Sequence, residues 1–354
     1  MAPIREPFSI LGVMFMATDY VVPTSMELQL VAQDLLPRLI LQRPIFTIFP
    51  IVEVDQSILA WEQLDNFTGL QQVRGLNGVP PRVKRTGGKR YLTEPGVYGE
   101  FTIIDELEIT RRRAFGSLDQ LIDITDLVAV EQQRLLQRRL DRVELILWTL
   151  LTTGTFSVST ITGGVAHTDS YTTQTFTATT GWGTLGTSTP LADFRSVKLL
   201  GRGHSVNFGA EARAYANSGT LNNFYNNANA NDLFGRRTGG FGTFNTPGEV
   251  NSLLAGDNLP QLVEYDAGYI DDTGTFHTHI PNNKVVVVGQ RPDGAPVGDY
   301  AMTRNANNPG QAPGAYMKVV DNGEDNVPRS IEVHDGHNGA PRLYWPSAVV
   351  IMSV

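Results

Sequence analysis

The stretch TDLVAVEQQRLLQRRLDRVELILWTLLTTG, residues 125–154, has the pattern of an unusually long amphipathic helix. Thr125 is an N-cap residue type, Asp126 complements the positive end of the helix dipole, and Gly154 is of the kind that stops a helix. Apolar residues recur with the i, i+3, i+4 rhythm of a single packed stripe, at Leu136, Leu140, Val143, Leu147, Leu150 and Leu151. At 1.5 Å per residue, a helix over residues 126–153 would be about 42 Å long, more than twice the average. We expect it to be a structural strut.

A basic stretch with a pair of glycines, RVKRTGGKRYLTEPGVYGEF, precedes this helix at residues 82–101. It lies between two strand patterns, IFTIFPIVEV at 45–54 and the imperfectly alternating residues 100–109. The connection between them is predicted to be a long two-stranded excursion with its tip near Gly87 and Gly88. Such a ribbon is marginal in water on its own. We therefore expect the ribbon, like the overlong helix, to be completed by neighbouring molecules.

Composition limits the classes of function. The 354 residues exceed the usual single core, so two or three subdomains are expected, and 41% of apolar residues are enough to fill them. The net charge of -8 argues against a protein whose main task is to bind nucleic-acid phosphates. Any DNA contact would be local and weak. The absence of cysteine excludes disulfides, thiolate metal sites and thiol nucleophiles.

The segment FSILGVMFMA, residues 8–17, is an apolar run of the length found in signal peptides. Glu6 and Pro7 stand where a basic region should precede it, and no A-x-A-like cleavage site follows. We expect an extended arm that is buried or covered by a partner. No stretch reaches the roughly 18 apolar residues that a membrane span needs, so no membrane association is predicted.

The other regular elements are shorter. Residues 25–36 read as a helix capped by Thr24 or Ser25, and Pro37 is expected to end or kink it. After the long helix, TFSVSTITGG and SYTTQTFTATTGWGTL predict a solvated β-hairpin, and PLADFRSVKLLGRG predicts a helix closed by Gly201. Strands are also predicted near the end of the chain, in QLVEYDAGYI (261–270), NKVVVVG (283–289) and SAVVIMSV (347–354).

The order of these elements resembles the Hong Kong 97-type fold of tailed-phage major capsid proteins. Residues 259–289, LPQLVEYDAGYIDDTGTFHTHIPNNKVVVVG, are similar to the phage lambda major capsid protein E family, in which a strand, a short acidic or glycine turn, an xPxNxxxxG segment and a buried strand follow one another. The final APRLYWPSAVVIMSV, residues 340–354, resembles that family's closing segment, where a proline-bearing turn leads into a last hydrophobic strand. The likeness spans nearly the whole chain as diffuse patterning.

The resemblance implies an α+β Hong Kong 97-like capsid fold divided into five segments. These would be an N-terminal arm (1–45), an extended β-hairpin loop that overlies a neighbouring subunit (46–110), a peripheral domain with the spine helix at 126–153 (111–204), an axial domain (205–330) and a C-terminal strand segment (331–354). The implied function is structural: pentamers and hexamers of the chain form an icosahedral shell, the virion capsid, around double-stranded DNA. The implied partners are scaffolding and portal proteins, with a decoration protein as a further candidate, and assembly would take place in the host cytoplasm.

Two alternatives stay open. An encapsulin-like compartment protein would share the fold but enclose cargo enzymes, with no portal or DNA. A metal-dependent enzyme or a β-rich binding module would instead use the histidine clusters. Large particles that contain DNA favour the capsid, whereas a monomer with tightly held metal favours the enzyme or binding module.

The basic stretch supplies the candidates for contacts between subunits, which are Arg82, Lys84, Arg85, Lys89, Arg90 and Glu94. Because the rest of the chain is acidic, the positive charges have complementary partners on a second copy. The alternatives are that the stretch binds nucleic acid or that it is a solvated loop tip. Some proteins of this fold cross-link a loop lysine to a neighbour's asparagine, but the lambda-like resemblance does not imply this for Lys84 or Lys89, and no cross-link is expected.

The Asn- and Gly-rich segments 222–231 and 235–242 are candidates for the axial pore, with Asn226, Asn227, Arg236 and Arg237 as the candidate residues. His277 and His279 have the spacing of one strand face, and His334, Asp335 and His337 form a second group, but each group lacks a clear third ligand on a rigid element. The glycine segments do not match a phosphate loop, and no G-x-S-x-G motif occurs. We expect no catalytic residues, no metal site and no cofactor.

Overall fold

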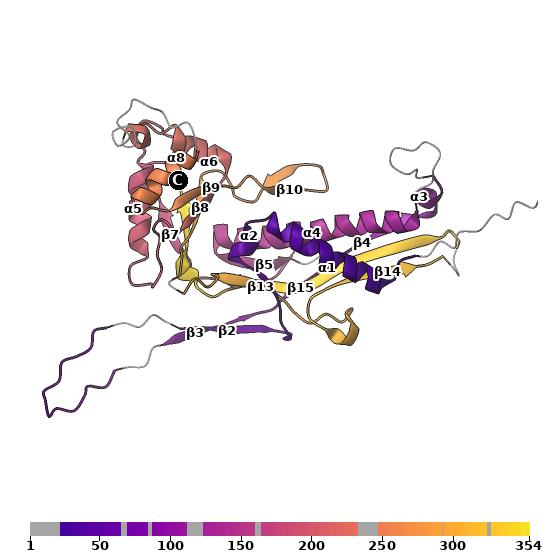
Figure 1. The fold of residues 1–354 in the computed structure, drawn as a ribbon, viewed down its shortest axis with the longest axis horizontal. Helices are drawn as coiled ribbons and strands as arrows, with labels where there is room; N and C mark the ends of the chain where they lie inside the picture. The colour runs from indigo at the N-terminus through magenta and orange to yellow at the C-terminus, as the bar shows by residue number, and fades with distance from the viewer. Residues whose placement is uncertain are drawn as a thin grey trace, which may run out of the picture.

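The structure is a computed structural model that describes residues 22–64, 69–83, 87–111, 123–159, 164–232, 247–291, 293–323 and 327–354. Figure 1 shows an elongated molecule with a long helix and sheet at one end, a compact helix-and-sheet unit at the other, and a two-stranded ribbon that leaves the body. The helices with described bounds are α1 (Ser25–Leu41), α2 (Ile45–Ile48), α3 (Glu106–Arg111), α4 (Ile124–Thr153), α5 (Pro190–Leu200), α6 (Ser218–Tyr225), α8 (Pro247–Gly256) and the 3₁₀ turns η1 (Pro309–Gln311) and η2 (Pro346–Ala348). Residues 228–232 are helical as well.

The predicted long helix is confirmed as α4, and its two ends have different physical causes. Asp123, not Thr125, is the N-cap: its carboxylate accepts a hydrogen bond from the Thr125 backbone N–H. Gly154 ends the helix in the left-handed conformation at φ 74°, where residues other than glycine are strained. The helix therefore starts two residues earlier than predicted and stops where its glycine requires.

Two five-stranded sheets form the scaffold. The first has the order β1 (Ile51–Glu53), β13 (Gly298–Met302), β15 (Ser330–Leu343), β14 (Ala315–Asp321), with β4 (Gly96–Asp105) on the other edge of β15. The second has the order β7 (Gln174–Thr177), β16 (Val349–Ser353), β12 (Lys284–Val288), β8 (Arg213–Ala216), β9 (Gln261–Glu264). The first sheet lies along α4, and the second lies within the compact unit (Figure 1).

Three two-stranded ribbons complete the strand inventory of the described residues. They are β2 (Leu59–Leu64) with β3 (Gly88–Thr93), β5 (Thr155–Ser159) with β6 (Val165–Ser170), and β10 (Gly268–Ile270) with β11 (Phe276–Thr278). The predicted Thr-rich hairpin is confirmed only in its first strand: β5 pairs with β6, which lies almost wholly before the second predicted stretch, whereas that stretch supplies β7, which pairs with β16. Helix α5, with Gly201 as its C-cap, confirms the helix that follows. The three strands predicted near the end of the chain are also present, as β9 with β10, β12 and β16.

Two hydrophobic cores meet along α4. Its first half packs with α1, β4, β14 and β15 through Leu127, Val128 and Leu135, among others. Its second half enters the larger core, where Leu147 and Trp148 have no exposed surface. Because one helix contributes to both cores, α4 couples the sheet beside it to the compact unit.

Several predicted boundaries were wrong, for identifiable reasons. Residues 45–54 were predicted as one strand, but they form α2 and then β1, because Ile45 and Phe49 are fully buried on the core and Pro50 interrupts the segment. Strand β4 ends at Asp105, whose carboxylate accepts from the Glu108 N–H and starts α3.

Helix α1 was predicted to end or kink at Pro37; it does not end there but continues to Leu41. Leu36, Leu39 and Ile40 pack against the larger core and hold the last turn in place. At the other end of α1, Thr24 caps the helix in a capping box with Glu27, as one of the two predicted caps. Tertiary packing here outweighs the local cost of a proline.

Strand pairing crosses the predicted segment boundaries. β13 and β14, from the 205–330 segment, pair with β15 in the sheet beside α4, whereas β16 pairs with β7 and β12 in the compact unit. The bounds of the five segments therefore do not coincide with the sheets of the single chain. The roles of these segments in an assembled shell stay a prediction.

Candidate functional site

The ribbon β2–β3 is anchored at its base by aromatic side chains. Trp61 stacks on Tyr91 and Tyr171, with ring centroids 5.4 and 6.2 Å apart, and its indole N–H donates to the Leu343 carbonyl at 3.3 Å. Leu59, in the first pair of the ribbon, is fully buried. The base is part of the core, whereas the rest of the ribbon leaves the body (Figure 1).

The prediction that the tip of the ribbon lies near Gly87 and Gly88 is wrong. Gly88 pairs with Leu64 at the last rung of the ladder, and residues 69–83 lie in the connection beyond it. Within that connection, apolar side chains recur at nearly every third position and are almost completely exposed: Leu70 (96%), Val73 (97%), Leu76 (100%), Val79 (90%) and Val83 (76%). We call these residues the apolar tip. Among the described residues, nothing covers this series.

The charged contact candidates are only partly placed together. Lys89 and Arg90 are exposed neighbours on β3, where the ladder places Arg90 opposite Glu62. Arg82 and Glu94 are also exposed. No ion pair joins Arg82, Lys89, Arg90 or Glu94 to another residue in the described parts of the chain, so these charges are available to a partner. Lys84 and Arg85 lie outside the described residues.

The pore candidates divide in the same way. Asn226 is exposed at the end of α6, but Asn227 is fully buried. Its amide donates to the Ser188 hydroxyl at 2.7 Å and its oxygen accepts from the Ala230 N–H at 3.0 Å. Asn227 is thus a structural residue, because its hydrogen-bonding groups are used to hold a turn. Arg236 and Arg237 lie outside the described residues.

The two histidine groups do not converge. His277 is exposed and hydrogen-bonds Asp271 at 2.9 Å, whereas His279 is buried beside Glu144. In the second group, Asp335 and His337 line a pocket beside α4, but His334 stacks on Phe101, with centroids 5.1 Å apart. Among the described residues, no group of three His, Cys, Asp or Glu side chains could hold a metal ion.

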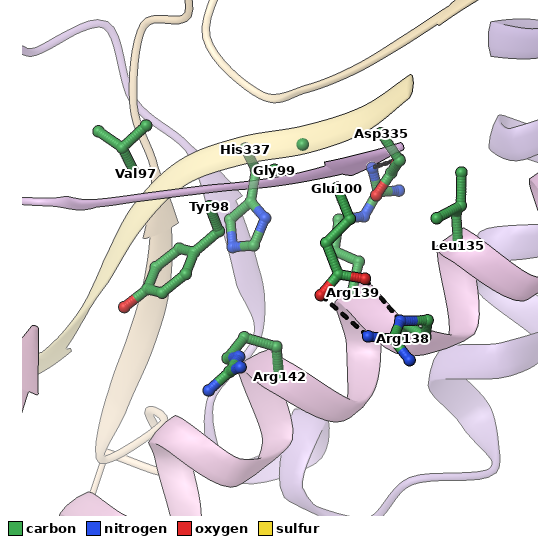
Figure 2. Close-up of a pocket in the computed structure, with 11 residues that line it drawn as sticks. Val97, Tyr98, Gly99, Glu100, Leu135, Arg138, Arg139, Arg142, Asp335 and His337 are labelled. Carbon is green, nitrogen blue, oxygen red and sulfur yellow. Dashed lines mark hydrogen bonds and ion pairs between the residues drawn. The ribbon is translucent and has the colours of Figure 1, made fainter. Parts of the chain in front are cut away.

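The pocket beside α4 is a charged site that sequence reasoning did not find. We call it the spine pocket: a cavity of about 170 Å³ lined by Val97, Tyr98, Gly99, Glu100, Leu135, Arg138, Arg139, Arg142, Asp335, Gly336 and His337. Figure 2 shows arginines from α4 directed toward β4 and β15. Arg138 holds both oxygens of Glu100, at 2.5 and 3.2 Å, and Arg139 donates to Asp335 at 2.7 Å. The two carboxylates of the pocket are therefore already paired.

Burial governs the ionisation of these groups. Desolvation raises the pKa of Asp335 to about 6, although the neighbouring Arg139 opposes the shift. It also lowers the pKa of His337 to about 3, and the positive charges of Arg139 and Arg142 add to this. At neutral pH, His337 is uncharged and Asp335 is ionised against Arg139.

A second charge cluster lies next to the spine pocket along α4, at Asp141 and the buried Glu144. Arg43, between α1 and α2, donates to Glu144 and to Asp141, both at 2.6 Å. His279 lies 3.9 Å from Glu144, and neither of its ring nitrogens has a partner in the described structure. Desolvation raises the pKa of Glu144 and lowers that of His279 to about 4. This cluster ties the segment before β1 to the helix.

No helix within the described ranges is long and apolar enough to cross a membrane. A long helix beside one sheet, a compact unit around a second sheet and a projecting ribbon are the architecture of the Hong Kong 97-type fold. Solved structures agree on the fold. A protein assigned as a prophage capsid protein of E. coli CFT073 is 13% identical with a TM-score of 0.57, and the alignment covers 91% of this chain and 98% of that one. A phage-related protein from Bordetella bronchiseptica RB50 is also 13% identical, with a TM-score of 0.53 and 94% and 98% coverage.

The family model of phage major capsid protein E matches residues 36–321, and the chain belongs to this family. No curated relative matches the chain. The role of the protein is structural: it is a major capsid protein that builds the shell of a bacteriophage head. The predicted fold class and function are thus confirmed. The family implies self-assembly of identical chains and a place in the virion.

Proposed function

We propose that the projecting ribbon joins neighbouring subunits of the shell, with the apolar tip docking on a second copy of the chain. The observation that carries this proposal is the series Leu70, Val73, Leu76 and Val79, whose side chains are exposed by 90% or more. Burying each such side chain against a neighbour would contribute on the order of 1.5 kcal/mol. Trp61 and Leu59 fix the base of the ribbon in the core of its own subunit. Docking of the tip would therefore set the orientation of the two subunits and not merely tether them.

The exposed charges on the ribbon give the contact its direction. Lys89 and Arg90 lie on the outer strand, and the chain as a whole carries a net charge of -8, so a second copy offers mostly acidic surface. Charge complementarity of this kind raises the association rate and excludes wrong orientations more than it adds affinity. In the ribbon, the apolar side chains of the tip would thus supply affinity, and the positive charges of Lys89 and Arg90 would steer association.

The finer features of the shell follow from the family and belong to this proposal. Pentamers and hexamers would form around scaffolding and portal proteins in the host cytoplasm, and a decoration protein would add to the outside. Packaged DNA would be held by weak, non-specific contact, in keeping with the acidic chain. The protein would not act as an enzyme, and no observation on this chain favours an encapsulin-like role.

The decisive experiment substitutes the apolar tip in the full-length chain. Leu70→Ser, Val73→Ser and Leu76→Ser are combined, and particles are counted by negative-stain electron microscopy and analytical ultracentrifugation. The proposal expects a folded chain with an unchanged circular dichroism spectrum and a loss of closed shells. Val165→Ser, an exposed apolar residue on the β5–β6 ribbon, is the matched control and should assemble normally. Normal shells from the triple variant would refute the role of the tip.

A further inference from the structure

Three asparagines of the chain are followed directly by glycine, and the structure gives them different surroundings. They are Asn77, Asn322 and Asn338. An asparagine loses its amide when the backbone nitrogen of the next residue attacks the side-chain carbonyl carbon. Glycine favours this attack, because it has no Cβ to shield the nitrogen and its backbone is the least restricted. The reaction therefore needs an accessible side chain, a backbone that is free to move and a nitrogen that is able to lose its proton.

The pair Asn322–Gly323 is held by neighbouring carboxylates. The side-chain amide of Asn322 donates a hydrogen bond to Glu332 at 3.0 Å. The Gly323 N–H donates to the carboxylate of Asp321 at 2.9 Å. A nitrogen that attacks must first lose its proton, and a charge-assisted hydrogen bond to a carboxylate keeps that proton in place. This pair is therefore protected from the reaction.

The pair Asn338–Gly339 lies inside the first sheet. Gly339, on β15, pairs with Met302 of β13 and with Gly96 of β4. The side-chain amide of Asn338 is also occupied, because it donates to the Arg304 carbonyl at 2.9 Å. Ring closure would require the backbone of this pair to leave its strand, so the reaction would need the sheet to open.

The pair Asn77–Gly78 has none of this protection. It lies in the connection that carries the apolar tip, and both residues are exposed. The side-chain amide of Asn77 has no hydrogen bond to any described residue. The Gly78 N–H donates to the Gly75 carbonyl at 2.9 Å within an exposed turn, which opens without disturbing any packed side chain. The Arg74 guanidinium, 3.1 Å from the Gly78 carbonyl, places a positive charge beside the residue whose nitrogen must become negative.

We propose that Asn77 is a site of spontaneous deamidation in subunits that have not assembled. The Gly78 nitrogen gives its proton to solvent and forms a bond to the side-chain carbonyl carbon of Asn77. The bond from that carbon to the amide nitrogen breaks, and the nitrogen takes a proton back from solvent and leaves as ammonia. The resulting succinimide ring is opened by water at either of its carbonyls, which leaves an aspartate or an isoaspartate at position 77.

The new carboxylate would lie between Leu76 and Val79, two residues of the apolar tip. Burying a charge in an apolar contact is costly, and its sign matches the net charge of -8 on a second copy. Deamidation would therefore weaken docking of the tip and limit the time for which a free subunit stays competent to assemble. This consequence, unlike the reaction itself, rests on the function proposed for the ribbon.

Peptide mapping of the full-length protein tests the site. The unassembled fraction is isolated by size-exclusion chromatography, incubated at mildly alkaline pH, digested with trypsin and analysed by mass spectrometry, with an unincubated sample digested in parallel. The three asparagines fall on separate tryptic peptides, residues 75–82, 319–329 and 330–342. We expect the acid to accumulate in the first peptide alone, and faster as pH rises, because the attacking nitrogen must lose its proton. An unchanged Asn77, or equal rates at all three positions, would overturn the proposal.

Gly78→Ala separates the chemistry from mere exposure, because it keeps the Asn77 amide and adds only a Cβ, 3.3 Å from the Gly75 backbone. The rate at Asn77 should fall by about tenfold, which corresponds to about 1.4 kcal/mol in the activation barrier. Gly75→Ala is the matched control, because its Cβ would meet no atom within 4 Å and the attacking residue is unchanged. It should react as the wild type does. A Gly78→Ala chain that reacts at the wild-type rate would refute the mechanism.

The same mapping on assembled shells distinguishes this site from the docking of the tip. If the tip docks on a second copy, Asn77 should keep its amide in shells while it reacts in free subunits. Equal rates in shells and free subunits would refute the docking and leave the deamidation site in place. An intact Asn77 in free subunits would refute the site and leave the docking unaffected.

Discussion

The spine helix and the projecting ribbon use similar apolar residues in opposite ways. On α4, Leu147 and Trp148 are wholly buried by their own chain, whereas Leu70 and Leu76 on the ribbon are almost wholly exposed. The helix therefore derives its stability from the single molecule, whereas no described residue covers the apolar tip of the ribbon, which would gain stability from a partner. The difference separates what this chain needs to fold from what it needs to assemble.

The largest expected change in the free energy of unfolding comes from a substitution in the core. Trp148→Ala removes a fully buried ring that packs against Tyr215 and Tyr265, with centroids 5.5 and 4.6 Å away. Unfolding in urea should show a loss of about 3–5 kcal/mol, and shells should be lost along with the fold. Thr149→Ala, at the exposed neighbouring position, should change stability by no more than about 0.5 kcal/mol. A stable Trp148→Ala chain would show that α4 is not the common core.

The next largest effect is expected at the buried ion pair of the spine pocket. Asp335→Asn leaves Arg139 charged and without a carboxylate, and should cost about 3 kcal/mol in denaturant unfolding. The double variant Arg139→Met, Asp335→Leu removes both charges and should recover most of that loss. If the double variant is no more stable than the single one, the pair contributes through shape rather than charge.

A pH-dependent effect is expected at His279. Its folded-state pKa of about 4 lies below the ordinary value of 6.5, so the stability it contributes is present above pH 6.5 and is lost as pH falls toward 4. His279→Leu removes this dependence and should be more stable than the wild type at pH 4 by on the order of 2 kcal/mol. Thermal unfolding across pH 4–8 measures the difference, and parallel curves for the two proteins would contradict it.

The smallest effect on folding belongs to the ribbon. Lys89→Glu with Arg90→Glu changes only exposed side chains, so the free energy of unfolding should move by no more than about 0.5 kcal/mol. Shell assembly followed by light scattering should nevertheless slow, and the wild-type rate should fall with added salt while the variant rate does not. If the variant and the wild type assemble at equal rates, Lys89 and Arg90 do not take part in the contact between subunits, and only the apolar tip does.

Local signals explain which parts of the fold were predictable. The ends of α4 lie near the predicted ones because capping residues and Gly154 act within one turn. Strand β15 was predicted only as part of the C-terminal strand segment 331–354, without bounds of its own, because many of its residues are polar and its extent depends on pairing with β4, β13 and β14. Strand propensity of this kind depends on partners that the local sequence does not contain.

The same limit applies to the sites. The charges of the ribbon are visible in the sequence, but the apolar tip is not, because single apolar residues between polar ones give no helix or strand period. The spine pocket pairs Arg139 with Asp335, which are 196 positions apart, so no local pattern could bring them together.

The place of β16 in its sheet has a consequence for synthesis. The strand lies between β7 and β12, parallel to one and antiparallel to the other, and Val349, Val350 and Met352 are fully buried. A nascent chain on the ribosome thus leaves β7 and β12 with unpaired edges until residue 353 emerges. Ribosome-stalled fragments would lack this interior strand, so only chains translated to this point would supply subunits with a finished sheet to a growing shell.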